Sequence, residues 1–245
     1  MKFKLVIAYD GTPFAGWQVQ PNGRTIQEEI EKALFQVMGK ELKIVGAGRT
    51  DAKVHARGQV AHLILEAPPP PSFQKSLNAL TPNEISILSI EPVNEDFHAR
   101  FSAKEKLYVY HVTSDPVQLP FDQNYSLHYT YPLSFNLMKE AIPHLIGKHD
   151  FSAFANQSFL FEEGKNPVKT LFAIDIAPHP SGFSLLFRGD GFLYKMVRNL
   201  TGLLLDIGRG KIPPSEAKRI LLSKDRKQAP SAAPPHGLTL HSISY

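Results

Sequence analysis

Two neighbouring stretches near the start of the chain decide the fold class: Met1–Asp10, which reads MKFKLVIAYD, and Thr25–Gly39, which reads TIQEEIEKALFQVMG. In the first, apolar residues alternate as they do along a half-buried β-strand, at Phe3, Leu5 and Ile7. In the second, they recur with helical spacing, at Ile26, Ile30, Ala33, Leu34 and Val37. Thr25 and Glu28 form a capping box, and Gly39 is a suitable helix stop. The sequence therefore opens with a strand followed by an amphipathic helix.

The rest of the first half extends this pattern. Strands are predicted near residues 42–45 and 59–65, separated by a loop over 46–58. A proline connector, Pro68–Pro71, leads into a short helix, and a fourth strand is predicted near 85–88. The order strand, helix, strand, strand, helix, strand is that of a ferredoxin-like unit.

The second half repeats the order of elements without a detectable sequence repeat. Its predicted strands cover residues 101–112, 171–176, 183–187 and 238–245, and its predicted helices cover 135–145, 192–207 and 215–222. We therefore predict an α/β (α+β) protein of two ferredoxin-like βαββαβ halves, residues 1–100 and 101–245. Their antiparallel or mixed sheets are expected to join around a central basic cleft, with the first half carrying the Asp51 loop and the second a basic helix.

Composition excludes several classes of protein. The 245 residues contain no cysteine, which rules out disulfides, thiol nucleophiles and thiolate zinc sites and fits the cytoplasm. We find neither a secretion signal nor an apolar run that could span a membrane. P-loop, dinucleotide-binding and HExxH patterns are also missing, so no metal or nucleotide cofactor is predicted.

Positive charge is concentrated in one segment. The chain has a net charge of +4, but Arg188–Lys227 alone holds ten Lys and Arg against four Asp and Glu. Such a segment is typical of a phosphate-binding face, and a solvated helix face is the alternative.

The densest group of unusual residues lies in Gly46–Gln59, which reads GAGRTDAKVHARGQ. It places one carboxylate, Asp51, among four basic or potentially basic groups, Arg49, Lys53, His55 and Arg57. Nearby positive charge favours the ionised carboxylate, which can then serve as a nucleophile or a base. Alternatively, Asp51 forms a turn and the cations are simply solvated.

The segments GRTDA (48–52), VHA (54–56) and GQV (58–60) resemble the signature of the TruA-type tRNA pseudouridine synthase family. Seven further blocks are similar to that family in the same order: Tyr9–Gln18, Leu77–Pro82, Phe97–Ala103, Lys106–Tyr110, His149–Phe154, Phe192–Asn199 and Ala233–Leu238. One position departs, because Lys53 stands where the family commonly has glycine. If that position requires a positive φ, a lysine there is strained and the aim of Asp51 is affected.

The resemblance implies an isomerase that converts uridine to pseudouridine in the anticodon stem-loop of tRNA, at positions 38 to 40 in tRNA numbering. It further implies catalysis by Asp51 without a cofactor or metal, a homodimer, and a cytoplasmic location. Asp51 would either attack covalently or remove a ribose proton. Two other readings stay open: a catalytically silent tRNA-binding protein or chaperone, disabled by Lys53, and a synthase that acts on another RNA.

The same resemblance suggests the residues that bind substrate. A stacked uridine must be flipped out, and Arg49 is expected to fill its place, although it could instead only pair with Asp51. Tyr108 matches the family tyrosine that stacks on the flipped uracil, whereas Tyr110 is expected to pack in the core. Arg198 is expected to face Asp51 or a phosphate, with a buried structural ion pair as the alternative. His55 and Lys195 complete the predicted substrate-binding set.

Overall fold

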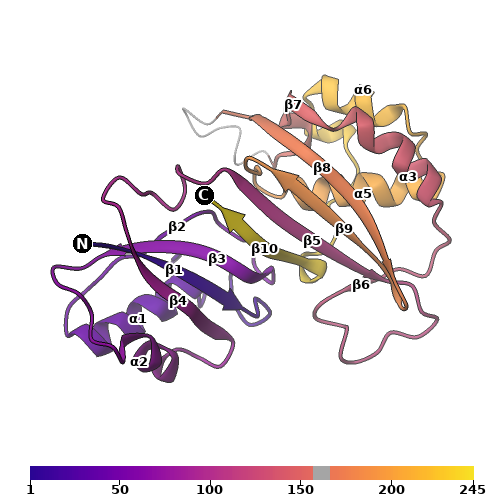
Figure 1. Ribbon diagram of the computed structural model, residues 1–245. Coiled ribbons are helices and arrows are strands. Elements are labelled where there is room, and N and C mark those ends of the chain that lie inside the picture. The colour runs from indigo at the N-terminus through magenta and orange to yellow at the C-terminus, as the bar shows by residue number, and fades with distance from the viewer. Residues whose placement is uncertain (157–165) are drawn as a thin grey trace. The chain divides into compact units, whose positions relative to one another are not determined.

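The computed structural model describes residues 1–156 and 166–245 (Figure 1). The chain divides into two compact units, one formed by Met1–Lys104 with Thr239–Tyr245 and the other by Glu105–Leu238. None of the helices within these described residues is long and apolar enough to cross a membrane. Each unit is an α/β structure, as the sequence predicts.

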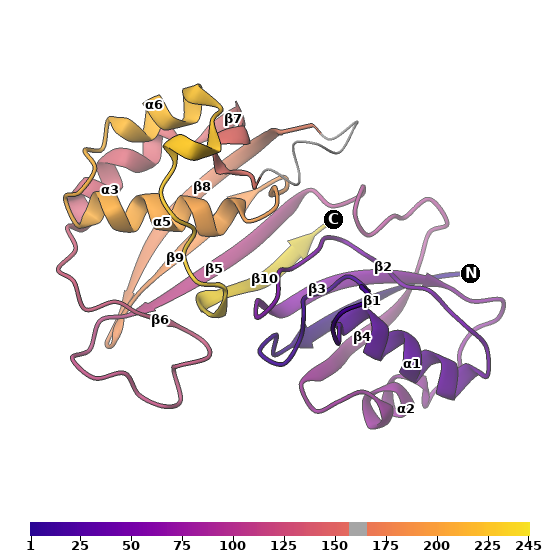
Figure 2. The same cartoon turned by 180° about the vertical axis from the view of Figure 1, so that it is seen from behind.

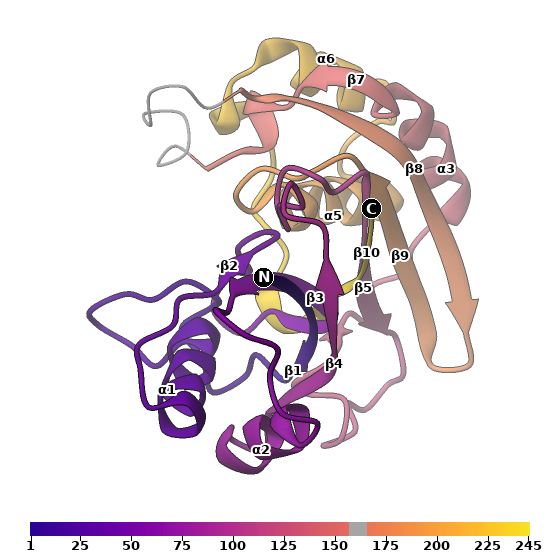
Figure 3. The same ribbon diagram turned by 60° about the vertical axis from the view of Figure 1, so that its left-hand side comes forward.

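The first unit has the predicted β-α-β-β-α-β order. Its elements are β1 (Lys2–Tyr9), α1 (Ile26–Met38), β2 (Val45–Gly46), β3 (His55–Ile64), α2 (Phe73–Leu80) and β4 (Ile85–Val93). Strand β1 lies between β3 and β4 and is antiparallel to both, while β2 pairs with β3. The two helices pack against each other beside this sheet (Figure 3).

Strand β3 begins earlier than the sequence pattern predicts. The predicted start lies near Gln59, but β3 starts at His55 because Tyr9, at the end of β1, pairs with Ala56. The preceding strand is shorter than predicted and consists only of Val45–Gly46. The loop between the two strands is therefore residues 47–54, which we call the Asp51 loop.

The last strand, β10 (Leu238–Ser244), completes the first unit's sheet. Thr239 and Leu240 pair in parallel with His55 and Ala56 of β3. A Cβ at Gly58 would lie 2.6 Å from the His241 carbonyl oxygen, so the close approach of the two strands requires glycine there. The sequence pattern places this strand in the second half, because a local pattern identifies a strand without identifying its partner.

The second unit contains a mainly antiparallel sheet covered by helices. Four antiparallel strands follow the order β5 (Glu105–Thr113), β9 (Gly182–Gly189), β8 (Val168–His179) and β7 (Gly147–Asp150), and the short β6 (Leu127–His128) pairs in parallel with β5. Helices α3 (Phe135–Ala141), α5 (Met196–Gly208) and α6 (Glu216–Ser223) pack together on this sheet (Figure 2). Short 3-10 turns cover Ile142–His144, Ser152–Phe154, Arg226–Gln228 and Pro235–Gly237.

Helix α5 confirms the predicted apolar stripe and corrects its start. Leu193, Val197, Leu200 and Leu204 are all buried. The helix begins at Met196 rather than near Phe192, because Lys195 adopts a left-handed conformation with φ of 61° and interrupts the helical backbone. Lys195 thus occupies the N-cap position.

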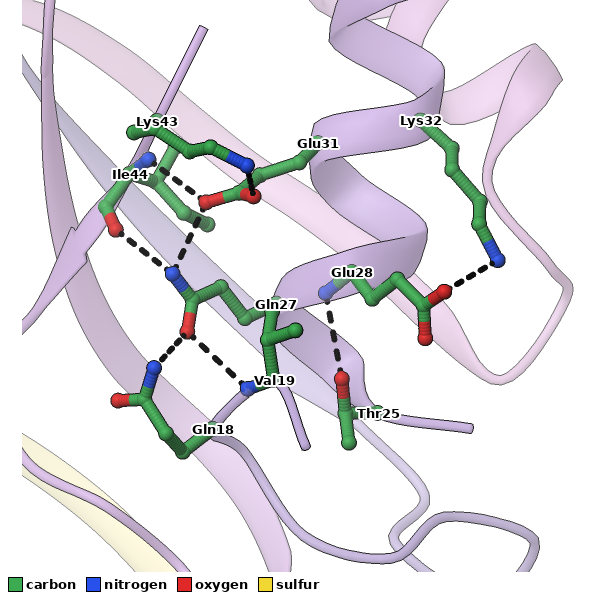
Figure 4. A network of polar contacts seen from close by, with 9 residues as sticks. All are labelled: Gln18, Val19, Thr25, Gln27, Glu28, Glu31, Lys32, Lys43 and Ile44. Carbon is green, nitrogen blue, oxygen red and sulfur yellow. Dashed lines mark hydrogen bonds and ion pairs between the residues drawn. The ribbon is translucent and has the colours of Figure 1, made fainter. Parts of the chain in front are cut away.

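A buried polar network fastens α1 to the segment that leads into β2 (Figure 4). The Glu31 carboxylate accepts hydrogen bonds from the Ile44 N–H (3.1 Å) and from Gln27 Nε2 (2.9 Å), and it pairs with Lys43 Nζ at 2.9 Å. Gln27 also accepts a hydrogen bond from Gln18 Nε2 at 2.7 Å. Because the network joins α1 to residues 18–19 and to residues 43–44, it fixes the approach to the Asp51 loop.

Candidate active site

The Asp51 loop connects β2 to β3 at one end of the first unit's sheet. Arg49 and Lys53 in the loop, and Arg57 on β3, are exposed, whereas Asp51 is half-buried. The loop thus holds one partly shielded carboxylate with an exposed cation on either side of it in the sequence.

The backbone of this loop is held by the segment that precedes α1. The Trp17 N–H donates to the Thr50 carbonyl (3.1 Å), and the Lys53 N–H donates to the Phe14 carbonyl (3.3 Å). Gly16 has a φ of 98°, and a Cβ there would lie 2.6 Å from the Thr50 carbonyl oxygen. Glycine is therefore required where the two segments touch.

Side chains add a buried hydrogen-bonded clamp, made by Tyr9, Thr50 and Gln59. The Tyr9 hydroxyl lies 2.8 Å from Thr50 Oγ1, and Gln59 Nε2 donates to the Gly48 carbonyl (3.0 Å) and to the Tyr9 hydroxyl (3.5 Å). Burial raises the pKa of Tyr9, so this phenol stays neutral. The clamp bonds to Gly48 and Thr50, the residues directly before Arg49 and Asp51, and so fixes the backbone from which both side chains project.

His55 lies inside the first unit. The residue is only 4% exposed, and the Nδ1 atom of His55 accepts a hydrogen bond from the Gly11 N–H at 3.1 Å. The same nitrogen lies 3.1 Å from Asp10 Oδ1, which also accepts from the Thr12 N–H and hydroxyl. His55 therefore joins the end of β1 to the start of β3, a location suited to positioning the loop.

Lys53 adopts the positive φ that is expected where related sequences commonly have glycine. Its φ is 64°, in the left-handed region that glycine enters at no steric cost. The loop nevertheless keeps its turn, with the Val54 N–H donating to the Asp51 carbonyl at 3.2 Å. Lysine at this position thus costs stability locally without unfolding the loop.

Tyr108 and Tyr110 lie on β5 in the second unit. Tyr108 is 8% exposed and packs edge-to-face against Phe192, with ring centroids 5.2 Å apart. Tyr110 is fully buried, and its hydroxyl donates to the Pro234 carbonyl at 2.8 Å. The prediction that Tyr110 packs in the core is confirmed.

Arg198 and Lys195 lie at the start of α5. Arg198 is half-buried, its Nε donates to the Ala233 carbonyl (2.8 Å), and its own carbonyl accepts from the Ala233 N–H (2.9 Å). Lys195 Nζ lies 5.1 Å from the centre of the Tyr194 ring. The segment around Ala233 therefore orients Arg198, and the left-handed Lys195 projects next to an exposed aromatic ring.

The basic segment is partly neutralised by its own structure. Several of its cations form ion pairs within the described residues, among them Arg188 with Asp175, Lys211 with Asp206, Arg219 with Glu216, and Lys224 with Asp150. The Arg226 guanidinium donates to the Ala229 carbonyl and to Asn199 Oδ1. A phosphate at these positions would have to compete with existing acceptors, so the segment is less basic than its composition indicates.

Sequence reasoning assigned no role to Tyr9, Thr50 or Gln59. All three fall within segments quoted for the family resemblance, but nothing in their spacing shows that they meet.

Within the described residues, no group of three or more His, Asp or Glu side chains is arranged to hold a metal ion.

Comparison with known proteins identifies relatives along the whole chain. A profile described as tRNA pseudouridine synthase matches residues 5–102 and 141–245. The chain is 45% identical over 245 residues to tRNA pseudouridine synthase A 1 of Protochlamydia amoebophila, covering 99% of this chain and 96% of the relative. It is also 45% identical over 248 residues to tRNA pseudouridine synthase A of Listeria monocytogenes, covering 100% and 99%.

Replacing Tyr9 by phenylalanine tests the clamp. The change leaves the buried Thr50 hydroxyl and Gln59 amide short of a partner, and we expect the free energy of unfolding to fall by about 1 to 3 kcal/mol. Amide hydrogen exchange of residues 48–51 should also accelerate. Urea denaturation and exchange mass spectrometry measure both effects. Tyr194→Phe, at an exposed tyrosine, is the control, and equal behaviour of the two variants would contradict the clamp.

Replacing Lys53 by glycine tests the strain in the loop. Glycine removes the steric cost of the positive φ, so the free energy of unfolding should rise by about 1 kcal/mol. Lys53→Ala is the matched control, because alanine lacks the lysine charge but retains the Cβ and therefore the strain. Urea denaturation compares the three proteins, and an equal gain in both variants would attribute the effect to charge.

Proposed function

Because the chain belongs to the tRNA pseudouridine synthase family, we propose that it isomerises uridine to pseudouridine in the anticodon stem-loop of tRNA, at positions 38 to 40, with Asp51 as the catalytic carboxylate. The reaction breaks the bond between N1 of uracil and C1′ of ribose and forms a bond between C5 and C1′. C5 then loses its proton and N1 gains one, so that no atom is added and no oxidant or reductant is needed.

The position of Asp51 is the observation that carries this proposal. The carboxylate is half-buried in a loop whose backbone is fixed by the Tyr9, Thr50 and Gln59 clamp. A fixed, partly shielded carboxylate can attack a sugar or remove a ribose proton without first reorganising. The clamp also supports an active enzyme over a silent RNA-binding protein, because the loop keeps its turn despite the strain at Lys53.

Arg49 is proposed to occupy the space that the flipped uridine leaves. It is exposed and lies two residues before Asp51, and a guanidinium can both stack on bases and bind phosphate. Tyr108 is proposed to stack on the uracil, and Arg198 and Lys195 to bind the substrate's phosphates or the catalytic carboxylate. His55 is buried, and we propose that it serves substrate binding indirectly, by holding the loop.

We further propose that the protein acts as a homodimer in the cytoplasm, where its tRNA substrate is found. The basic segment predicts an affinity for RNA that falls steeply as salt rises, because phosphate contacts release condensed counterions. The ion pairs within that segment occupy some of its cations and moderate this dependence.

Asp51→Asn tests the catalytic assignment. The amide can neither attack nor accept a proton, so we expect pseudouridine formation to fall at least about 100-fold while tRNA binding persists. Purified enzyme is incubated with unmodified tRNA, which is then digested and analysed for nucleosides by mass spectrometry. Asp175→Asn, at an exposed carboxylate of β8, is the control. If the wild type binds tRNA but forms no pseudouridine, the protein is a catalytically silent tRNA-binding protein. If it forms pseudouridine only in other RNA, it is a synthase with a different RNA substrate.

Arg49→Ala tests base flipping. If the guanidinium stabilises the flipped state, turnover should fall by about 10-fold or more while tRNA affinity changes far less. Single-turnover kinetics and filter binding separate the two quantities. Arg57→Ala removes another exposed arginine, from β3, and should affect both weakly. Equal losses of turnover and affinity in Arg49→Ala would indicate a simple phosphate contact.

A further inference from the structure

A rigid turn over residues 97–102 follows β4 in the first unit. The His98 N–H donates to Ser102 Oγ (3.0 Å), and the Ser102 N–H donates back to the His98 carbonyl (2.9 Å). His98 Nδ1 also accepts from the N–H groups of Arg100 (3.1 Å) and Phe101 (3.3 Å). These four bonds fix the backbone that carries the Arg100 and Phe101 side chains.

The inner side of the turn is anchored to the base of the Asp51 loop. Ala99 is fully buried and packs in one cluster with Ala47, the first residue of that loop, and Val60. The Ala99 N–H donates to His62 Nδ1 (3.1 Å), and its carbonyl accepts from the Tyr245 hydroxyl (2.7 Å). Burial, together with the charges of His98 and Lys2, lowers the pKa of His62 to about 4, so this ring is a neutral acceptor at pH 7.

The outer side of the turn exposes an aromatic ring to solvent. Phe101 is 77% exposed. The His98 ring lies 4.3 Å from it at an angle of 34°, and the Arg100 guanidinium carbon lies 5.7 Å from its centroid. Neighbouring groups thus orient the ring while most of its surface stays open to solvent.

We propose that Phe101 is a stacking platform for an unpaired nucleobase of the RNA, with Arg100 binding the accompanying phosphate. This inference rests on the proposed function, which supplies the RNA. Aromatic rings beside arginine are the usual surface on which unpaired bases stack, and the contact needs no particular base. The packing of Ala99 on Ala47 joins this turn to the base of the Asp51 loop, so the turn and the loop belong to one rigid part of the first unit, which favours RNA over a protein partner.

The test measures RNA binding by an enzyme that cannot turn over. Fluorescence anisotropy in an Asp51→Asn background gives the Kd for an anticodon stem-loop and for a series in which each loop base in turn is replaced by an abasic site. Phe101→Ala should weaken binding to the intact RNA roughly 5- to 100-fold, whereas Phe101→Trp should retain affinity. Phe35→Ala, at an exposed phenylalanine of α1, is the matched control and should bind normally.

The abasic series separates stacking from a structural effect. On the RNA that lacks the partner base, Phe101→Ala should cause no further loss, whereas an equal loss on every RNA would overturn the proposal. Unchanged binding of Phe101→Ala would also overturn it. A change confined to the oligomeric state, measured by light scattering, would overturn it too and would indicate that Phe101 contacts a second copy of the chain. If wild type forms pseudouridine while Phe101→Ala binds normally, this inference alone fails. If wild type forms none in any tRNA, the proposed function fails first.

Discussion

The hydrogen bonds among Tyr9, Thr50 and Gln59 are the interaction on which the site depends. They join the end of β1 and the interior of β3 to the loop between β2 and β3. A buried polar group without a partner is costly, so the three side chains stabilise one loop conformation against others. The consequence is functional, because the residues held are the immediate neighbours of Arg49 and Asp51.

Close backbone approach reinforces this constraint. Gly11 and Gly16 pass so near the Asp51 loop that a Cβ would lie 2.1 Å from the Val54 carbonyl oxygen and 2.6 Å from that of Thr50. Two loops thus share one rigid backbone layer, with His55 and Asp10 joining it to the sheet. Within such a layer the strain at Lys53 is tolerated, because the surrounding hydrogen bonds determine the conformation more strongly than one residue's preference.

Local patterns predicted the elements of the first unit well, since strand alternation and the Thr25 cap are properties of neighbouring residues. They could not identify pairing partners, and so β10 was assigned by position along the chain rather than by its bonds to β3. Asp51 and Arg49 were recognisable as unusual residues in one loop. The clamp was not, because Tyr9 and Gln59 are 50 residues apart in the sequence and meet only when β1 pairs with β3. The burial of His55 was missed for the same reason, since its partner Gly11 follows β1 and lies 44 residues before His55 in the sequence.

The basic segment Arg188–Lys227 is partly neutralised by contacts that its composition does not show. The segment Arg188–Lys227 carries the chain's excess of cations, yet several of them are bound to carboxylates or carbonyls within the second unit. Such pairs contribute little net attraction at a distance, because each cation's field is largely cancelled by its partner. Affinity for RNA must then come more from positioned contacts than from a general field. Stacking on a fixed ring is a contact of that kind, and it is weakly sensitive to salt. An enzyme that binds its RNA in this way can select an unpaired loop over the far more abundant duplex, whose bases are already stacked on one another.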